Sequence, residues 1–171
     1  MRTMLEPLPP EVHSPRVAPR ASLIVARGEL PGLEADVWMG GAHSHVGDPM
    51  HAQELGEAAV IECAGDLPAH FAPATKLWVP CIFIDIEGRP VRFERLLEIA
   101  VRVADAARGR SAEPVEQVYS ICTHGMNRSG LMAGLVLREL GMSGGEIVER
   151  IVTRRPGALS NVSFRQILLE E

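Results

Sequence analysis

The chain has 171 residues, a formal net charge of -5 and 46% hydrophobic residues. This length suits one globular domain, and this composition excludes a disordered or fibrous protein. The negative charge gives no overall attraction to nucleic acid or to an anionic membrane surface, so phosphate groups would have to be bound at a local site.

The sequence contains neither a segment that would direct it to a membrane nor a cysteine pattern that would bind a metal. No stretch approaches 18 consecutive apolar residues, and the Pro-rich N-terminus lacks the apolar segment of a signal peptide. The three cysteines are an odd number without the spacing of metal ligands, which favours free thiols in a reducing compartment. We therefore expect a cytoplasmic protein that does not contact a membrane.

Residues 1–20 are rich in proline and poor in apolar residues, which predicts an extended arm before a domain spanning residues 21–171. Three segments that follow combine apolar and β-branched residues in short runs, as strands do. The expected strands are residues 35–39, 58–63 and 77–85.

The second half of the chain is predicted to contain one strand and several helices. Apolar residues recur at three- and four-residue spacing over residues 92–108, which predicts a helix that ends at Gly109. A strand at 114–122 precedes a helix at 129–140, and capping boxes at 143–146 and 163–166 predict two more helix starts. With few aromatic residues, this order predicts an α/β fold with a central, mainly parallel sheet flanked by helices.

A cysteine and an arginine, separated by five residues, lie where the strand ending at residue 122 meets the following helix. The intervening backbone amides can curl around a tetrahedral anion, and the helix adds the positive end of its dipole. The same field favours a thiolate at the cysteine. The pattern predicts that Cys122 attacks phosphorus and that the planar guanidinium of Arg128 holds two phosphoryl oxygens.

The other loop residues are expected to bind phosphate mainly through their backbone amides. They are Thr123, His124, Gly125, Met126 and Asn127. Gly125 allows a tight turn that points the amides inward, and the Ser129 hydroxyl is expected to donate to the thiolate or to the departing phosphate. In the competing interpretation, Cys122 is an inert buried thiol and Arg128 is a surface charge. Inert cysteines do not need an electropositive loop of this kind.

Residues 122–130, Cys-Thr-His-Gly-Met-Asn-Arg-Ser-Gly, resemble the signature loop of the protein tyrosine and dual-specificity phosphatase superfamily. The loop lies late in the chain, which favours the dual-specificity type over the low-molecular-weight phosphatases and arsenate reductases. The resemblance extends from about Leu33 to Glu170, because Val-Trp-Met-Gly-Gly at 37–41 is similar to the family's opening strand and turn. It implies hydrolysis through a phosphocysteine intermediate without metal or cofactor.

The residue before Cys122 departs from the family pattern, and the residues within the loop are also similar to those of a second group of phosphatases. The family usually has His before the nucleophile, where this chain has Ile121, which leaves open how strongly the loop stabilises the thiolate. The loop is also similar to that of RNA 5'-triphosphatases of capping enzymes, and residues 155–159 resemble a Pro-Gly segment of those enzymes. An RNA 5' end is therefore an alternative substrate, although the chain has no basic tract for a polynucleotide.

Expulsion of the leaving group needs a proton donor. Asp85 is the candidate acid, because it lies at the end of the expected strand and before the expected helix, where the dual-specificity family carries its acid; Glu87 is the alternative. The competing role for Asp85 is a turn or cap carboxylate. By the same resemblance, Cys63 is a candidate for a disulfide with Cys122, although a buried apolar thiol is the plainer interpretation.

Some polar residues outside the loop have alternative interpretations. His43, His45 and His51, with Asp48 nearby, have metal-ligand character and make a metallohydrolase the rival enzyme class, but no partner ligands follow later in the chain.

Asn127, beside Arg128, is a candidate for holding the loop or meeting the substrate, and by the resemblance Asn161 is a candidate for bracing the loop. Arg154 and Arg155 are candidates for adding positive potential near the pocket, although a solvated helix end is the plainer interpretation of this charge pair.

These features predict a phosphatase that acts on phosphotyrosine and also on phosphoserine or phosphothreonine. The expected substrate is a phosphorylated protein or a small phosphoester. A non-catalytic phosphate-binding module is a second alternative, against which the retained Cys122 and Arg128 argue.

Overall fold

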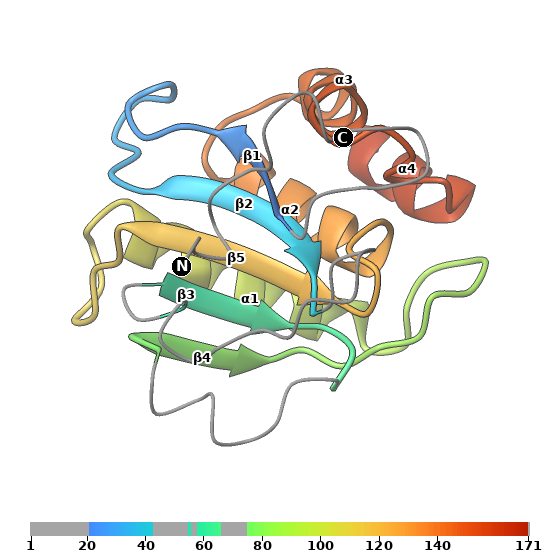
Figure 1. Cartoon of the computed structure of the whole chain (residues 1–171), viewed down its shortest axis with the longest axis horizontal. Coiled ribbons are helices and arrows are strands. Elements are labelled where there is room, and N and C mark those ends of the chain that lie inside the picture. Colours follow the sequence, from blue (N-terminus) through green and yellow to red (C-terminus); the bar gives the residue numbers. More distant parts are fainter. Residues whose placement is uncertain (1–20, 43–54, 56–57, 66–74, 171) are drawn as a thin grey trace.

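The computed structural model describes residues 21–42, 55, 58–65 and 75–170. Within these residues the chain forms a five-stranded sheet in the order β1-β2-β5-β3-β4, as Figure 1 shows. β1 runs antiparallel to β2, and every other pairing is parallel. The strands are β1 (Ala21–Val25), β2 (Asp36–Gly41), β3 (Ala58–Glu62), β4 (Leu77–Pro80) and β5 (Gln117–Cys122). The expected α/β fold with a mainly parallel sheet is therefore confirmed.

The central strand, β5, fixes the position of the candidate nucleophile. Five of its six residues, Val118 to Cys122, are buried, as expected of a strand covered on both faces. β2 and β3 pair with it on either side in parallel, so the carboxyl ends of all three strands meet at one edge of the sheet. Cys122 ends β5 at this edge, which is where open parallel sheets bind ligands.

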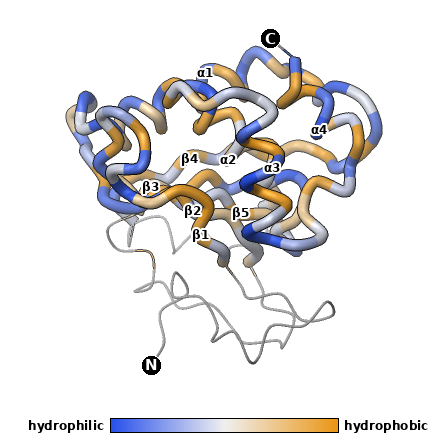
Figure 2. Tube along the Cα trace, turned by 90° about the horizontal axis from the view of Figure 1, so that it is seen from above, coloured by the Kyte–Doolittle hydropathy of each residue, from blue (hydrophilic) through white to orange (hydrophobic). Residues whose placement is uncertain are grey.

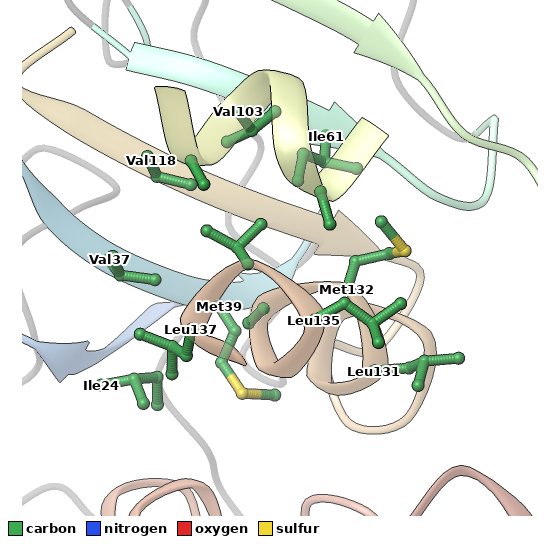
Figure 3. Packing of buried hydrophobic residues seen from close by; sticks show 14 of the residues in the cluster. Ile24, Val37, Met39, Ile61, Val103, Val118, Leu131, Met132, Leu135 and Leu137 are labelled. Atoms are coloured by element: carbon green, nitrogen blue, oxygen red, sulfur yellow. The ribbon is translucent and has the colours of Figure 1, made fainter. Parts of the chain in front are cut away.

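The four helices of the described residues cover one face of the sheet. Side chains from all of them join the strands in a single core cluster, part of which is drawn in Figure 3, and Figure 2 shows the helices on one side of the strands. Helix α2 lies at the centre of this layer, since Ser129 through Leu137 are all buried. The helices are α1 (Phe93–Ala107), α2 (Arg128–Glu139), α3 (Gly144–Arg154) and α4 (Val162–Leu169).

Two strand predictions need correction. The expected strand at 77–85 is too long, because β4 ends at Pro80 and its partner β3 ends at Glu62. Beyond Pro80 the Cys81 and Phe83 N–H groups still donate to the Glu62 and Cys63 carbonyls, at 2.8 and 3.3 Å, so the segment stays beside the end of β3. Strand β1 was not predicted; it has five residues, of which all but Ser22 are apolar, directly follows the Pro-rich arm, and joins the sheet at the edge next to β2.

One helix start was predicted correctly and another was not. Ser143 caps α3 by accepting a hydrogen bond from the backbone N–H of Glu146, as the capping box predicts. Helix α4 is instead capped by Asn161, whose Oδ1 accepts from the Phe164 N–H at 3.2 Å. The Ser163 hydroxyl accepts from the Gly88 N–H, so it is used to hold a loop rather than to start the helix.

Parts of the sequence-based interpretation lie outside the described residues. These are the arm at 1–20 and the cluster His43, His45, Asp48 and His51. Along the rest of the chain, no helix is both long enough and apolar enough to cross a membrane.

Candidate active site

Cys122 lies at the bottom of the loop that joins β5 to α2, and its side chain is only 3% exposed. Its Sγ accepts a hydrogen bond from the Gly125 N–H at 3.2 Å. The thiol also donates to the buried Ser129 Oγ at 3.4 Å, and on ionisation the serine hydroxyl can rotate and donate to the sulfur instead. A backbone amide and a hydroxyl thus lie within hydrogen-bonding distance of the sulfur, and donation from Ser129 to a thiolate stays a prediction.

Gly125 makes the tight loop possible for two independent reasons. Its φ of +72° is a left-handed conformation that side chains disfavour. A Cβ at this position would also lie 2.2 Å from the carbonyl carbon of Gly40 and 2.3 Å from the nitrogen of Gly41. The loop therefore packs directly on the backbone at the end of β2, and no residue other than glycine fits there.

Arg128 is the first residue of α2 and turns its guanidinium back over the loop. One terminal nitrogen donates to Thr123 Oγ1 at 3.1 Å and the other to the Phe83 carbonyl at 3.4 Å. Its Nε is buried and has no hydrogen-bond partner among the described residues. A buried donor without a partner is costly, and an anion bound in the loop would satisfy it.

The N-terminus of α2 strengthens this anion site. No side chain caps the helix, because Asn127 directs its side chain elsewhere, and no acidic residue lies in the first turn. The first amides of a helix have no partners within the helix and carry its positive dipole end. The loop amides, these helix amides and Arg128 can together hold a tetrahedral anion above the Cys122 sulfur.

Arg155 supports the loop from below. The interpretation of this residue as part of a solvated helix end is wrong. Arg155 is 1% exposed, whereas its neighbour Arg154 is exposed as expected. Arg155 Nε donates to the Gly125 carbonyl at 2.6 Å, and one terminal nitrogen donates to the His124 carbonyl at 3.4 Å. The other terminal nitrogen donates to Ser22 Oγ in β1 at 3.0 Å.

Arg155 directs two loop carbonyls away from the phosphate side. Burial lowers the pKa of its guanidinium, and interaction with Cys122 and Tyr119 opposes that shift. The family's His before the nucleophile is Ile121 here, and its side chain is buried on the opposite face of the sheet. The Tyr119 hydroxyl instead donates to the Gly41 carbonyl at 2.9 Å, next to the loop. Support for the loop therefore comes from β1, β5 and the end of α3.

His124 itself is exposed, in keeping with the expectation that its backbone rather than its side chain serves the loop. Met126 is half-buried, and its carbonyl accepts from the Leu159 N–H at 3.0 Å. The segment between α3 and α4 is thus tied to the loop at a further point.

The structure brings Asp85, Asn127 and Asn161 together at the mouth of the loop. The Asp85 carboxylate accepts from Asn127 Nδ2 at 3.0 Å through one oxygen and from Asn161 Nδ2 at 2.8 Å through the other. Asn127 Oδ1 in turn accepts from the Asn161 N–H at 2.9 Å. Both asparagines therefore brace the loop, as predicted.

A hollow of about 370 Å³ opens beside this network, lined by Asp85, Glu87, Asn127, Ser160, Asn161, Val162 and Ser163. Glu87 shares the hollow, but Asp85 is the carboxylate bonded to a loop residue. Of the two candidate acids, Asp85 is therefore the one joined directly to the loop.

The three cysteines occupy equivalent positions on neighbouring strands. Cys63 follows β3 and donates its N–H to the Ile121 carbonyl of β5 at 2.7 Å, while the Cys81 N–H donates to Glu62. All three are buried free thiols, which agrees with the plainer interpretation of Cys63; the candidate Cys63–Cys122 disulfide is not formed here. Burial raises the pKa of Cys63 well above its ordinary value and that of Cys81 to about 12.

No cluster of three or more His, Cys, Asp or Glu side chains within the described residues is arranged to hold a metal ion. The histidine cluster of the rival metallohydrolase lies in the segment that is not described.

Comparison with known proteins identifies the fold. No family model and no curated protein sequence matches the chain. Among solved structures, the archaeal protein tyrosine phosphatase Tk-PTP in its active form matches with a TM-score of 0.59 and 19% identity, over 88% of this chain and 94% of that one. Human DUSP28 matches with a TM-score of 0.56 and 21% identity, over 95% and 93%. The predicted resemblance is thereby confirmed for the fold, which is that of the dual-specificity phosphatases.

Proposed function

We propose that this chain is a cysteine-dependent phosphatase that hydrolyses phosphate monoesters through a phosphocysteine intermediate. One observation carries the proposal: the Cys122 sulfur, the uncapped start of α2 and the Arg128 Nε, which has no partner in the part of the chain that the structure describes, meet at a single loop. The fold shared with known phosphatases supports it.

In the first step the Cys122 thiolate attacks phosphorus, and the bond to the leaving oxygen breaks. Arg128 and the amides of the loop hold the equatorial oxygens and stabilise their developing charge. Asp85 donates a proton to the leaving oxygen from the mouth of the loop. In the second step the same carboxylate takes a proton from water, which displaces the Cys122 sulfur and releases inorganic phosphate.

The substrates that suit this site are phosphotyrosine and phosphoserine or phosphothreonine esters, because an alkoxide or phenolate leaving group requires the proton that Asp85 supplies. Cleavage of an RNA 5'-triphosphate is the second candidate. It is favoured by the hydrogen bonds that occupy both Asp85 oxygens, since a phosphate leaving group does not need an acid.

The test compares wild type with Cys122→Ser on p-nitrophenyl phosphate, on phosphopeptides and on 5'-triphosphorylated RNA, each with and without chelator. We expect chelator-insensitive turnover of the monoesters by wild type and none by Cys122→Ser. Cys81→Ala is the matched control, because Cys81 is also a buried thiol but lies outside the loop. Inactivity of the wild type on all substrates, or full activity of Cys122→Ser, would show the mechanism to be wrong.

A further inference from the structure

Residues 81–86 follow the end of β4; buried and exposed side chains alternate from Cys81 to Ile84, and Asp85 and Ile86 are both exposed. Cys81 and Phe83 point into the core and are 4% and 8% exposed. Ile82, Ile84 and Ile86 point outward and are 67%, 69% and 58% exposed. We call these three residues the isoleucine stripe. Large aliphatic side chains gathered on one short surface segment are typical of a binding surface.

The isoleucine stripe is continuous with the candidate active site. Ile84 and Ile86 flank Asp85 directly, and adjacent Cα atoms are about 3.8 Å apart. The Asp85 side chain contacts Asn127 of the loop, while the Ile86 carbonyl accepts from Asn161 Nδ2 at 2.9 Å. The segment therefore runs along the rim of the phosphate site.

We propose that the isoleucine stripe binds aliphatic side chains next to the phosphorylated residue of a protein substrate. This inference rests on the proposed function, in which Asp85 protonates the leaving oxygen. Such a proton transfer requires about 2.6–3.2 Å between the two oxygens. A substrate residue held at that distance from Asp85 brings its chain neighbours close to Ile84 and Ile86, which flank Asp85 and are exposed.

The charges of the segment favour a protein over RNA as the occupant. Residues 81–88 contain no Lys or Arg, and their two charged residues, Asp85 and Glu87, are acidic. The next residue, Arg89, is engaged with Glu170 at 2.7 Å and stacks on the Phe93 ring at 4.4 Å. A polynucleotide would bring its phosphates against carboxylates and aliphatic side chains, whereas binding of RNA depends on basic contacts.

The test uses two phosphopeptides of equal length, one with aliphatic and one with acidic residues on both sides of the phosphorylated residue. We measure kcat/KM for each with wild type and with the double variant Ile84→Ser/Ile86→Ser, and divide it by kcat/KM for p-nitrophenyl phosphate, which has no flanking residues. We expect this ratio to fall by about tenfold for the aliphatic peptide, the effect of a few lost methylene contacts, and to stay unchanged for the acidic peptide. Val101→Ser is the matched control, since Val101 is 43% exposed on α1.

The outcomes separate this inference from the proposed function. If wild type turns over p-nitrophenyl phosphate but the aliphatic and acidic peptides respond alike to the double substitution, the isoleucine stripe does not select substrates. The same conclusion follows if 5'-triphosphorylated RNA is the preferred substrate, or if the substitutions change only the oligomeric state in analytical ultracentrifugation. Inactivity of the wild type on p-nitrophenyl phosphate contradicts the proposed function itself.

Discussion

Arg128 and Arg155 contact the same loop from opposite sides, and their guanidinium groups are used differently. Arg128 lies on the phosphate side with its Nε buried and unpartnered among the described residues. Arg155 lies beneath and donates to two loop carbonyls and to the hydroxyl of Ser22. Arg128 donates through its terminal nitrogens to Thr123 and Phe83 and keeps Nε for a ligand, whereas all three guanidinium nitrogens of Arg155 donate within the fold.

This difference assigns anion binding to Arg128 and support of the loop to Arg155. A donor left unsatisfied in the folded protein is stabilised only when an anion arrives, so its removal should affect turnover more than stability. A donor already bonded to buried carbonyls stabilises the native state directly, so its removal should affect folding as well. Each substitution below is designed to test this division.

The largest effect is expected for Arg128→Lys. Lysine keeps the charge but cannot hold two phosphoryl oxygens in the plane of a guanidinium, so kcat/KM on p-nitrophenyl phosphate should fall about 1,000-fold. The free energy of unfolding, measured in urea, should change by less than about 1 kcal/mol. A fall in kcat/KM of less than tenfold would show that Arg128 does not stabilise the transition state.

Arg155→Met should act mainly on stability. It leaves the carbonyls of His124 and Gly125 without this donor, and we expect a loss of about 3 kcal/mol in the free energy of unfolding, with a fall in kcat as the loop loosens. Arg154→Met, at the exposed neighbouring position, is the matched control and should be nearly neutral. Equal unfolding midpoints for Arg155→Met and wild type would contradict the supporting role.

Asp85→Asn tests whether the carboxyl group at the mouth of the loop acts as the general acid. Loss of the acid should lower kcat about 100-fold on phosphoserine peptides, whose alkoxide needs a proton, and less on p-nitrophenyl phosphate, whose leaving group is stable without one. Glu87→Gln, in the same hollow, should have little effect. If the two substrates lose activity equally, Asp85 acts only by holding Asn127 and Asn161.

The smallest expected change concerns Cys63, which lies beside the nucleophile on the neighbouring strand. Hydrogen peroxide oxidises the Cys122 thiolate to a sulfenic acid, and attack by Cys63 with loss of water would form a disulfide. Because burial raises the pKa of Cys63, its thiolate is scarce at neutral pH and the attack should accelerate as pH rises.

The Cys63 hypothesis is checked by recovery of activity after peroxide. Dithiothreitol should restore activity in wild type and in the control Cys81→Ala but not in Cys63→Ala, whose Cys122 would oxidise further. Equal recovery in all three proteins would exclude the pairing.

The sequence predicted most of the sheet and the strand-loop-helix arrangement at Cys122 because both depend on short local patterns. The Cys122-to-Arg128 spacing and the burial of β5 are visible in consecutive residues, and the capping box at Ser143 involves two residues in one turn. Strand β1 was missed because its five residues form a strand only by pairing with β2.

The contacts that the sequence did not reveal connect distant positions. Arg155 appears in the sequence as half of a charge pair, and only the tertiary structure places it under a loop 30 residues away, next to Ser22 of β1. A proline and a glycine directly after it mark the end of a helix, but nothing local distinguishes a buried arginine from an exposed one. Asn161 was predicted to brace the loop through the resemblance, and its second role as the cap of α4 was not.

The most direct test of the mechanism is to trap the intermediate. Wild-type protein is mixed with a ³²P-labelled phosphopeptide that it turns over, quenched in acid within milliseconds and digested, and the labelled peptide is identified by mass spectrometry. We predict acid-trapped label on the peptide that contains Cys122, and no label in Cys122→Ser. Turnover without a labelled enzyme, or label on any other residue, would contradict a phosphocysteine mechanism at this loop.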